Sequence, residues 1–129
     1  MALTVKVVTP SRIVFEDTAD SVTVPGWEGQ YTVLPAHASM LTLSRVGILK
    51  IKAGGSIQKF VIDKGFIEVG PTEMSVMVQH CVNIEDIDQD QAELDYEEAY
   101  ATFRSLKIND PIYENARKKM EYAKAKARV

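Results

Sequence analysis

The sequence is poor in the residues that build covalent and metal-dependent chemistry. Its single cysteine, Cys81, excludes a disulfide within the chain and is typical of a protein kept in a reducing compartment. It has only two histidines, and His80 adjoins Cys81 on a predicted strand, where neighbouring side chains point to opposite faces. These two residues therefore cannot hold one metal ion together. We expect a buried cysteine beside an exposed histidine, and no metal or cofactor.

Long apolar runs and an excess of positive charge are also missing. No apolar run approaches about 18 residues, which excludes a transmembrane helix. The first residues match neither a secretory signal nor a transit peptide, so we expect a soluble intracellular protein. The chain has 15 basic and 18 acidic residues, which argues against nucleic acid as a partner.

The net charge of −3 hides a division of the chain into three parts. Residues 1–84 carry seven basic and seven acidic side chains, residues 85–98 carry eight acidic and no basic ones, and residues 99–129 carry eight basic and three acidic ones. A length of 129 residues suits one domain with an appendage. The acidic run lacks the spacing of a calcium loop, so a solvated helix face is the preferred interpretation.

The first two thirds of the chain has the pattern of short strands. Apolar and polar residues alternate in 3–7, 21–24, 49–53 and 74–78, which indicates strands with one buried face. Turn signals separate these runs, among them Gly54-Gly55, a two-residue hairpin turn. Eight to ten strands at this spacing predict an antiparallel sandwich or barrel.

The last third has the pattern of two helices. Asp88 can cap the first helix and Gln91 can reach back to it in a capping box. We expect that helix to end around residues 107–109, and Asp110 followed by Pro111 to start the second as its N-cap and first helical residue. A connection of about four residues makes the two helices an antiparallel hairpin.

Each predicted helix has one narrow apolar stripe, in which spacings of three and four residues alternate. Alanine is frequent in both stripes, so the buried area is small and we infer a hairpin of marginal stability. The stripes consist of Ala92, Tyr96, Ala99, Phe103 and Leu106 on the first helix, and of Tyr113, Ala116, Met120, Ala123 and Ala127 on the second.

No combination of residues predicts an active site. His37 lies in a loop without the orienting partner that a general base needs, so a structural or contact role is the preferred interpretation. Trp27 is equally compatible with packing on the sandwich and with contacting a partner. Without a nucleophile–base pair, the chain does not look like an enzyme.

Several segments, in order along the chain, resemble the epsilon subunit of F-type ATP synthases. The most specific is EGQYTVLPAHA at 28–38, at its distance from VGILKI at 46–51. VTPSRIVF at 8–15, SVTVPG at 21–26, KGFIEV at 64–69 and IEDID at 84–88 extend the resemblance over essentially the whole chain. The resemblance implies an α+β fold: an N-terminal antiparallel ten-stranded β-sandwich over residues 1–86, then a C-terminal antiparallel helical hairpin over 87–129.

The resemblance also implies a function. Such a protein is a non-catalytic subunit of the rotor's central stalk and couples ion flow through the c-ring to ATP synthesis in the catalytic head. Its partners are the gamma subunit, the c-ring and, through the C-terminal helices, the catalytic alpha and beta subunits. It meets the membrane only through the complex, on the cytoplasmic face of a bacterial inner membrane or, alternatively, the stromal face of a plastid thylakoid.

The family's contact regions correspond to particular residues of this chain. The loop that meets the c-ring corresponds to about residues 28–38, including Glu28, Gln30 and His37. In this family the hairpin can extend toward the catalytic subunits and restrain ATP hydrolysis, with its last helix meeting an acidic segment. The basic residues available for this contact are Arg117, Lys118, Lys119, Lys124, Lys126 and Arg128.

Some bacterial members bind ATP at a motif that is degenerate here. The corresponding residues are Ile87, Asp88, Gln91 and Ala92, with glutamine in place of the arginine. Loss of this cation removes the strongest charge-assisted contact to phosphate, so we expect weak nucleotide binding or none. The alternative to a rotor subunit is a free-standing adaptor, a β-sandwich with a helical docking arm.

Overall fold

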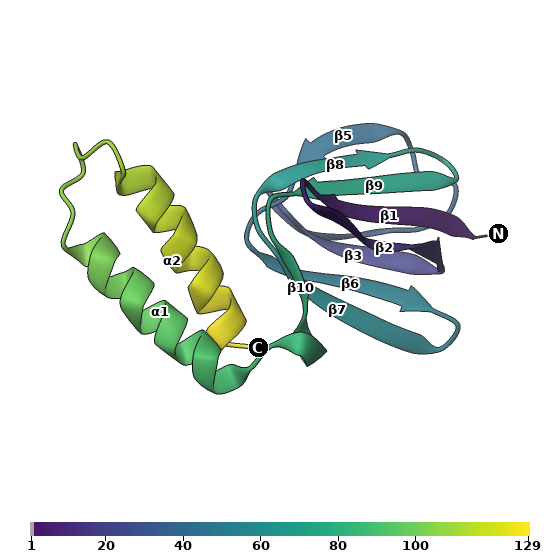
Figure 1. Ribbon diagram of the computed structural model, residues 1–129. Coiled ribbons are helices and arrows are strands. Elements are labelled where there is room, and N and C mark those ends of the chain that lie inside the picture. The colour runs from purple at the N-terminus through teal and green to yellow at the C-terminus, as the bar shows by residue number, and fades with distance from the viewer. Residues whose placement is uncertain (1) are drawn as a thin grey trace. The chain divides into compact units, whose positions relative to one another are not determined.

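The computed structural model describes residues 2–129 and divides the chain into two compact units (Figure 1). The first unit ends at Asn83 and the second is Ile84–Val129. The sequence placed this boundary after residue 86; the structure assigns the intervening single-turn helix η1 (Ile84–Asp86) to the second unit. No helix within residues 2–129 is long and apolar enough to span a membrane.

The first unit is a β-sandwich of two five-stranded sheets. One sheet has the order β2-β1-β9-β8-β5 and the other β10-β7-β6-β3-β4. The predicted sandwich is confirmed, with one exception to its antiparallel pairing: β1 and β9 run parallel. The strands are β1 (Leu3–Thr9), β2 (Arg12–Ala19), β3 (Ser21–Gly26), β4 (Gly29–Val33), β5 (Met40–Leu43), β6 (Gly47–Ala53), β7 (Ser56–Ile62), β8 (Gly65–Val69), β9 (Glu73–Val78) and β10 (Cys81–Asn83).

The core lies between the inner faces of the two sheets. Leu3, Val5 and Val7 of β1 are fully buried, and the residues between them are exposed, as the period-two pattern predicts. The rings of Phe15 and Phe60 meet across the sandwich edge-to-face, with their centroids 6.2 Å apart. The alternation read from the sequence therefore identifies the buried face of the sandwich.

The β6–β7 turn forms as predicted. Ala53 pairs with Ser56, so Gly54 and Gly55 are the two residues of the turn. Their φ angles of 57° and 84° lie in the left-handed region that glycine adopts without strain.

The second unit is a hairpin of helices α1 (Gln89–Arg104) and α2 (Tyr113–Ala127). Asp88 caps α1, and its Oδ1 accepts the Gln91 N–H at 3.2 Å. The predicted reciprocal bond of a capping box is wrong. The Gln91 side chain turns along the helix instead, and its Nε2 donates to Asp95 Oδ1 at 2.9 Å.

Both ends of the helix connection differ from the prediction. α1 ends at Arg104, about three residues early, with Ser105 Oγ donating to the Thr102 carbonyl at 2.7 Å. α2 begins at Tyr113, because Asp110 closes a turn ahead of the helix rather than capping it. The Asp110 side chain accepts the Ile112 N–H at 3.0 Å and its carbonyl accepts the Tyr113 N–H at 3.0 Å. Pro111 therefore lies in this turn and not at the first helical position.

The predicted seam between the helices is confirmed. All ten stripe residues are buried or half-buried. The fully buried side chains that the structure describes on α1 and α2 are four alanines: Ala92, Ala99, Ala123 and Ala127. Near the connection the rings of Phe103 and Tyr113 lie 5.0 Å apart. The larger seam side chains keep part of their surface in water, so the packing between the helices is shallow.

Candidate functional site

The turn between β3 and β4 presents an exposed aromatic side chain. Trp27 is 61% exposed, and Lys64 Nζ lies 5.4 Å from the centroid of its ring. The Trp27 N–H donates to the Leu43 carbonyl at 3.1 Å, which ties the turn to β5. Because most of its surface is exposed, Trp27 is not part of the core. Rigid, amphipathic side chains of this kind are frequent at protein interfaces.

The predicted c-ring residues do not form one cluster. Glu28 and Gln30 are exposed at the turn and the first residues of β4. His37 lies four residues beyond the other end of that strand. At roughly 3.3 Å per residue, the five-residue strand β4 keeps its ends about 13 Å apart. The structure therefore brings Glu28 and Gln30 together and separates His37 from them.

The loop that carries His37 is held by its backbone. The Ala36 N–H donates to the Pro71 carbonyl at 2.7 Å, and Ala36 has a φ of 65°. The half-exposed His37 ring places Nδ1 2.8 Å from the Ala38 carbonyl oxygen. The ring is thus oriented by a backbone group and not by a carboxylate, the partner expected for a general base.

His80 is exposed and Cys81 is buried, as predicted, although His80 lies just ahead of β10 and not on the strand. Exposed His80 places Nδ1 2.7 Å from Asp63 Oδ2. Cys81 is buried, and burial raises the pKa of its thiol to about 11, assisted by Asp63 and opposed by Arg12. Residues 2–129 contain no group of three His, Cys, Asp or Glu side chains placed to hold a metal ion.

An apolar row that the sequence analysis missed crosses the outer face of the first sheet. Strand register aligns one residue from each of five strands: Leu43 pairs with Phe66, Phe66 with Met77, Met77 with Val8, and Val8 with Ile13. Phe66 is 55% exposed, Ile13 53% and Met77 37%. We call these five residues the outer apolar row. A contiguous exposed row of this kind is typical of a protein interface.

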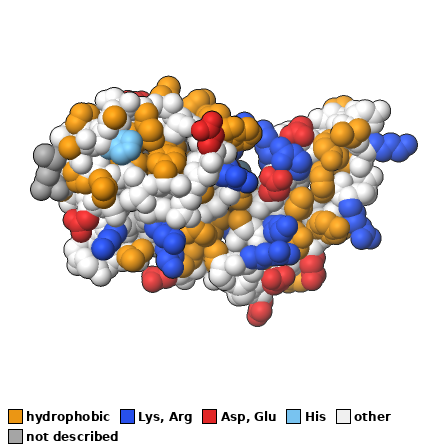
Figure 2. Space-filling model, turned by 180° about the vertical axis from the view of Figure 1, so that it is seen from behind, with side chains coloured by type: hydrophobic (Ala, Val, Ile, Leu, Met, Phe, Trp, Pro, Cys, Tyr) orange, Lys and Arg blue, Asp and Glu red, His pale blue; other side chains and the backbone are white. Residues whose placement is uncertain are grey.

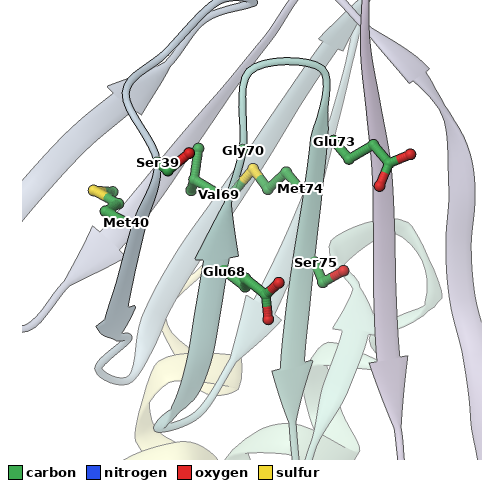
Figure 3. A pocket seen from close by; sticks show the side chains of 8 residues that line it. All are labelled: Ser39, Met40, Glu68, Val69, Gly70, Glu73, Met74 and Ser75. Atoms are coloured by element: carbon green, nitrogen blue, oxygen red, sulfur yellow. The ribbon is translucent and has the colours of Figure 1, made fainter.

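A shallow hollow of about 400 Å³ lies beside this row, near the β8–β9 turn (Figure 3). Glu68 and Ser75 lie side by side there on paired strands. The lining contains two carboxylates and no basic group, which does not suit a phosphate. Its lining residues are Ser39, Met40, Glu68, Val69, Gly70, Glu73, Met74 and Ser75.

The basic residues of the second helix do not form one stripe. With 3.6 residues per turn, Arg117, Lys124 and Arg128 lie on one flank of the seam, and Lys119 and Lys126 on the other. On the face of the hairpin visible in Figure 2, basic and acidic side chains are interspersed. The positive charge of this helix is therefore divided between the two flanks of the seam.

Three of these basic side chains have partners within the hairpin. Arg117 contacts Glu114 at 2.9 Å and Glu121 at 2.8 Å. The hydrogen bond with Arg117 lowers the pKa of Glu114, and the same bond raises the pKa of Arg117. Lys126 Nζ lies 5.4 Å from the ring centroid of Tyr122, and the Arg128 guanidinium 5.9 Å from that of Tyr96. Lys118, Lys119 and Lys124 are exposed.

The residues of the degenerate nucleotide motif take part in contacts within the hairpin. Asp88 caps α1, Gln91 bonds to Asp95, and Ala92 is buried in the seam, while Ile87 is half-buried ahead of the helix. None of the four supplies a positive charge for a phosphate group.

Comparison with known proteins identifies the family. Residues 2–84 match the family described as "ATP synthase, Delta/Epsilon chain, beta-sandwich domain". An ATP synthase epsilon chain of Synechococcus sp. (strain CC9902) is 33% identical over 129 residues, covering 100% of this chain and 95% of the relative. One from Prochlorococcus marinus (strain MIT 9313) is 30% identical over 129 residues, covering 100% and 97%.

Solved structures have the same fold. A chain of the Euglena gracilis mitochondrial ATP synthase, in a structure of its OSCP/F1/c-ring part, superposes with a TM-score of 0.79 at 20% identity, covering 96% of this chain and 78% of that one. A chain of the Tetrahymena thermophila mitochondrial ATP synthase central stalk and c-ring gives 0.68 at 14% identity, covering 98% and 97%.

The ten-stranded sandwich and its family match define the class, that of the delta and epsilon chains of ATP synthases. Within this class, the full-length relatives decide the assignment. The chain belongs to the family of ATP synthase epsilon chains. The resemblance read from the sequence is thereby confirmed.

Proposed function

We propose that the chain is a non-catalytic rotor subunit in the central stalk of an F-type ATP synthase. In this role it couples ion flow through the c-ring to ATP synthesis in the catalytic head. Membership of the epsilon family supports this proposal, as does the likeness to chains from a central stalk and an F1/c-ring assembly.

The observation that carries the proposal is the outer apolar row. A stalk subunit must hold a partner firmly against torque, and an exposed row across five paired strands offers a stiff apolar surface. We assign this row to the gamma subunit. Apolar side chains on a rigid sheet resist displacement without the mobility of a loop contact.

The c-ring contact falls to the turn between β3 and β4. Glu28 and Gln30 are exposed there beside Trp27, and together they combine a charge, an amide and an aromatic ring. His37 lies beyond the opposite end of β4, about 13 Å further along the strand, which is within the span of one protein interface. We therefore assign Glu28, Gln30 and His37 to the c-ring contact.

We assign the hairpin a regulatory role in which it restrains ATP hydrolysis by contact with catalytic alpha and beta subunits. The shallow seam supports this, because little buried area opposes separation of the helices. Exposed Lys118, Lys119 and Lys124 offer positive charge to an acidic partner. Since the nucleotide motif lacks its cation, the role as proposed needs no bound ATP.

The proposed location is the cytoplasmic face of a bacterial membrane, reached through the complex. The Synechococcus and Prochlorococcus relatives favour this over a plastid. A free-standing adaptor is the rival function, and washed membranes separate the two. A rotor subunit stays on the membrane with gamma and c subunits, whereas an adaptor is released.

The interface assignment is tested in the same membranes. The double variant Phe66→Ser/Met77→Ser removes the centre of the outer apolar row, and we expect it to reduce the gamma subunit recovered with the tagged chain at least tenfold. Leu41→Ser is the matched control, because Leu41 is 68% exposed on the same sheet but outside the row. Equal recovery of gamma with both variants would contradict the assignment.

A further inference from the structure

The hairpin has one end closed by the chain and one end closed only by side chains. Residues 105–112 connect the helices at the first end, where Phe103 also stacks on Tyr113. At the other end the start of α1 meets the finish of α2, and no peptide link joins them there. Any separation of the helices begins at this second end, because the first is covalently held.

Two contacts join the helices at this second end. Gln89 Nε2 donates to the carbonyl oxygen of Ala127, and the Arg128 guanidinium lies 5.9 Å from the ring centroid of Tyr96. We call Gln89, Tyr96, Ala127 and Arg128 the hairpin clasp. The Ala127 carbonyl is one of the last four in α2, and the helix itself offers these carbonyls no N–H donor. The clasp thus satisfies a helix terminus of α2 with a side chain from α1.

We propose that the hairpin clasp is a built-in closing device that holds the two helices together at the end of the hairpin where no peptide link joins them. The shallow seam makes such a device necessary, since its buried side chains are alanines that bring little apolar area. We expect no comparable help from a bound phosphate, because Gln91 stands where the ATP-binding members of the family have an arginine. The clasp closes the hairpin with protein groups alone.

The clasp changes the meaning of one predicted contact residue. Arg128 is exposed and faces Tyr96 in the closed hairpin, so an acidic partner that binds its guanidinium competes with the Tyr96 contact. Its two roles predict opposite effects of its removal. If Arg128 mainly closes the hairpin, its loss favours the open form. If it mainly contacts the catalytic subunits, its loss weakens that contact. This part of the inference rests on the proposed inhibitory function.

Amide hydrogen exchange on the full-length chain tests the clasp directly. An exposed cation–π contact corresponds to a factor of about 2–5 in an equilibrium constant. We therefore expect Arg128→Gln and Tyr96→Leu each to speed exchange about 2–5-fold over 92–99 and 120–127, with the strands unaffected. Gln89→Ala should act in the same direction.

Two variants serve as matched controls. Lys124→Gln removes an exposed charge from the same flank of α2, and it should leave the exchange rates unchanged. Tyr96→Phe keeps an aromatic face for Arg128, so it should exchange as slowly as the unmodified chain. The double variant Tyr96→Leu/Arg128→Gln should be no faster than the faster single variant. Unchanged exchange in both single variants, or strictly multiplicative effects in the double variant, would overturn the clasp.

ATP hydrolysis by the assembled complex separates the clasp from the inhibitory role. With both correct, Tyr96→Leu lowers hydrolysis, because an open hairpin is favoured and Arg128 remains available for the contact. Faster exchange without any change in hydrolysis keeps the clasp and removes the inhibitory role. Higher hydrolysis in Arg128→Gln, with normal exchange, assigns Arg128 to the contact and overturns its place in the clasp.

Discussion

The carboxylate of Asp63 and the imidazole of His80 meet at 2.7 Å across the turn that leads into β10. The other oxygen of Asp63 accepts the N–H groups of Gln79 and His80 at 3.1 and 3.0 Å. One side chain from the β7–β8 connection thus holds the backbone of the last turn of the sandwich. Asp63 therefore has a structural role in this turn.

Replacing Asp63 should destabilise the sandwich. Asp63→Ala leaves two backbone N–H groups without their acceptor, and we expect the free energy of unfolding to fall by about 1–3 kcal/mol. Asp63→Asn keeps an oxygen for these donors and should lose less. Urea denaturation of the two variants measures the difference. If both variants lost the same unfolding free energy, Asp63 would stabilise the sandwich through its charge and not through its hydrogen bonds to the turn.

Gly65 provides the clearest steric prediction. A Cβ at this position would lie 2.1 Å from the Met77 carbonyl oxygen, because β8 and β9 approach closely there. We expect Gly65→Ala to reduce the free energy of unfolding by about 1–3 kcal/mol through overpacking. Gly70→Ala is the control, since its nearest neighbour would be the Glu73 carbonyl oxygen at 3.6 Å. Thermal unfolding that ranks the two variants equally would contradict this explanation.

The Cys81 thiol should be unreactive in the folded protein. Its pKa of about 11, against the ordinary 9.0, leaves almost no thiolate near neutral pH. An aromatic disulfide reagent at pH 8 should react with it only after unfolding. Fast labelling without denaturant would contradict the burial of this side chain.

The same pKa shift predicts a pH dependence of stability. The unfolded chain releases the Cys81 proton near pH 9 and the folded chain near pH 11, so stability is unaffected below pH 9 and falls as pH rises between these values. Cys81→Ala removes this contribution. The difference in unfolding free energy between the two proteins should be constant below pH 9 and narrow above it. Urea titrations at pH 7, 9 and 10.5 measure this difference.

Tyr31 is a site where substitution should improve stability. Its hydroxyl is buried with no hydrogen-bond partner among residues 2–129, and burial raises its pKa. Tyr31→Phe removes a polar group whose desolvation is uncompensated, and we expect a gain of up to about 1 kcal/mol. The stability advantage of Tyr31→Phe should grow above pH 10, because there the tyrosine ionises more readily in the unfolded chain than in the folded one, which destabilises the unmodified protein. A loss of stability in urea denaturation would show that the hydroxyl has a partner.

Removing the hairpin tests its proposed regulatory role. A chain truncated after Asp86 keeps all ten strands, so we expect the complex to assemble normally. ATP hydrolysis should rise because the restraining arm is gone. Hydrolysis equal to that of the full complex, at equal subunit content, would remove the inhibitory role.

The sequence predicted what depends on local pattern. Period-two alternation identified the buried faces of β1 and β9, and Gly54-Gly55 identified a turn that needs positive φ. The helical stripes identified the seam, because an apolar face repeats every three to four residues whatever its partner. From these patterns alone, a sandwich and a barrel remained equally possible.

The sequence could not predict what depends on register between distant strands. The outer apolar row takes Ile13, Phe66 and Met77 from different strands, and only the pairing of these strands shows that the three residues are aligned. The sequence also could not show that β4 lies between Glu28 and His37 in the predicted contact loop. At the helix connection, the Asp110 side chain accepts the Ile112 N–H in a turn. Short-range propensity does not distinguish this turn from the predicted N-cap, because aspartate is frequent in both.

The parallel pairing of β1 with β9 also has a consequence for the order of folding. Val5 lies opposite Met74, so the first strand acquires this neighbour only after most of the sandwich has been synthesised. Contacts this distant in sequence slow folding, whereas the helical hairpin relies on contacts close in the chain. On the ribosome, the edge of β1 that pairs with β9 must therefore wait with its backbone groups unpaired until β9 has been made. The segment made last has the topology that folds fastest, and the segment made first is among the last to be completed.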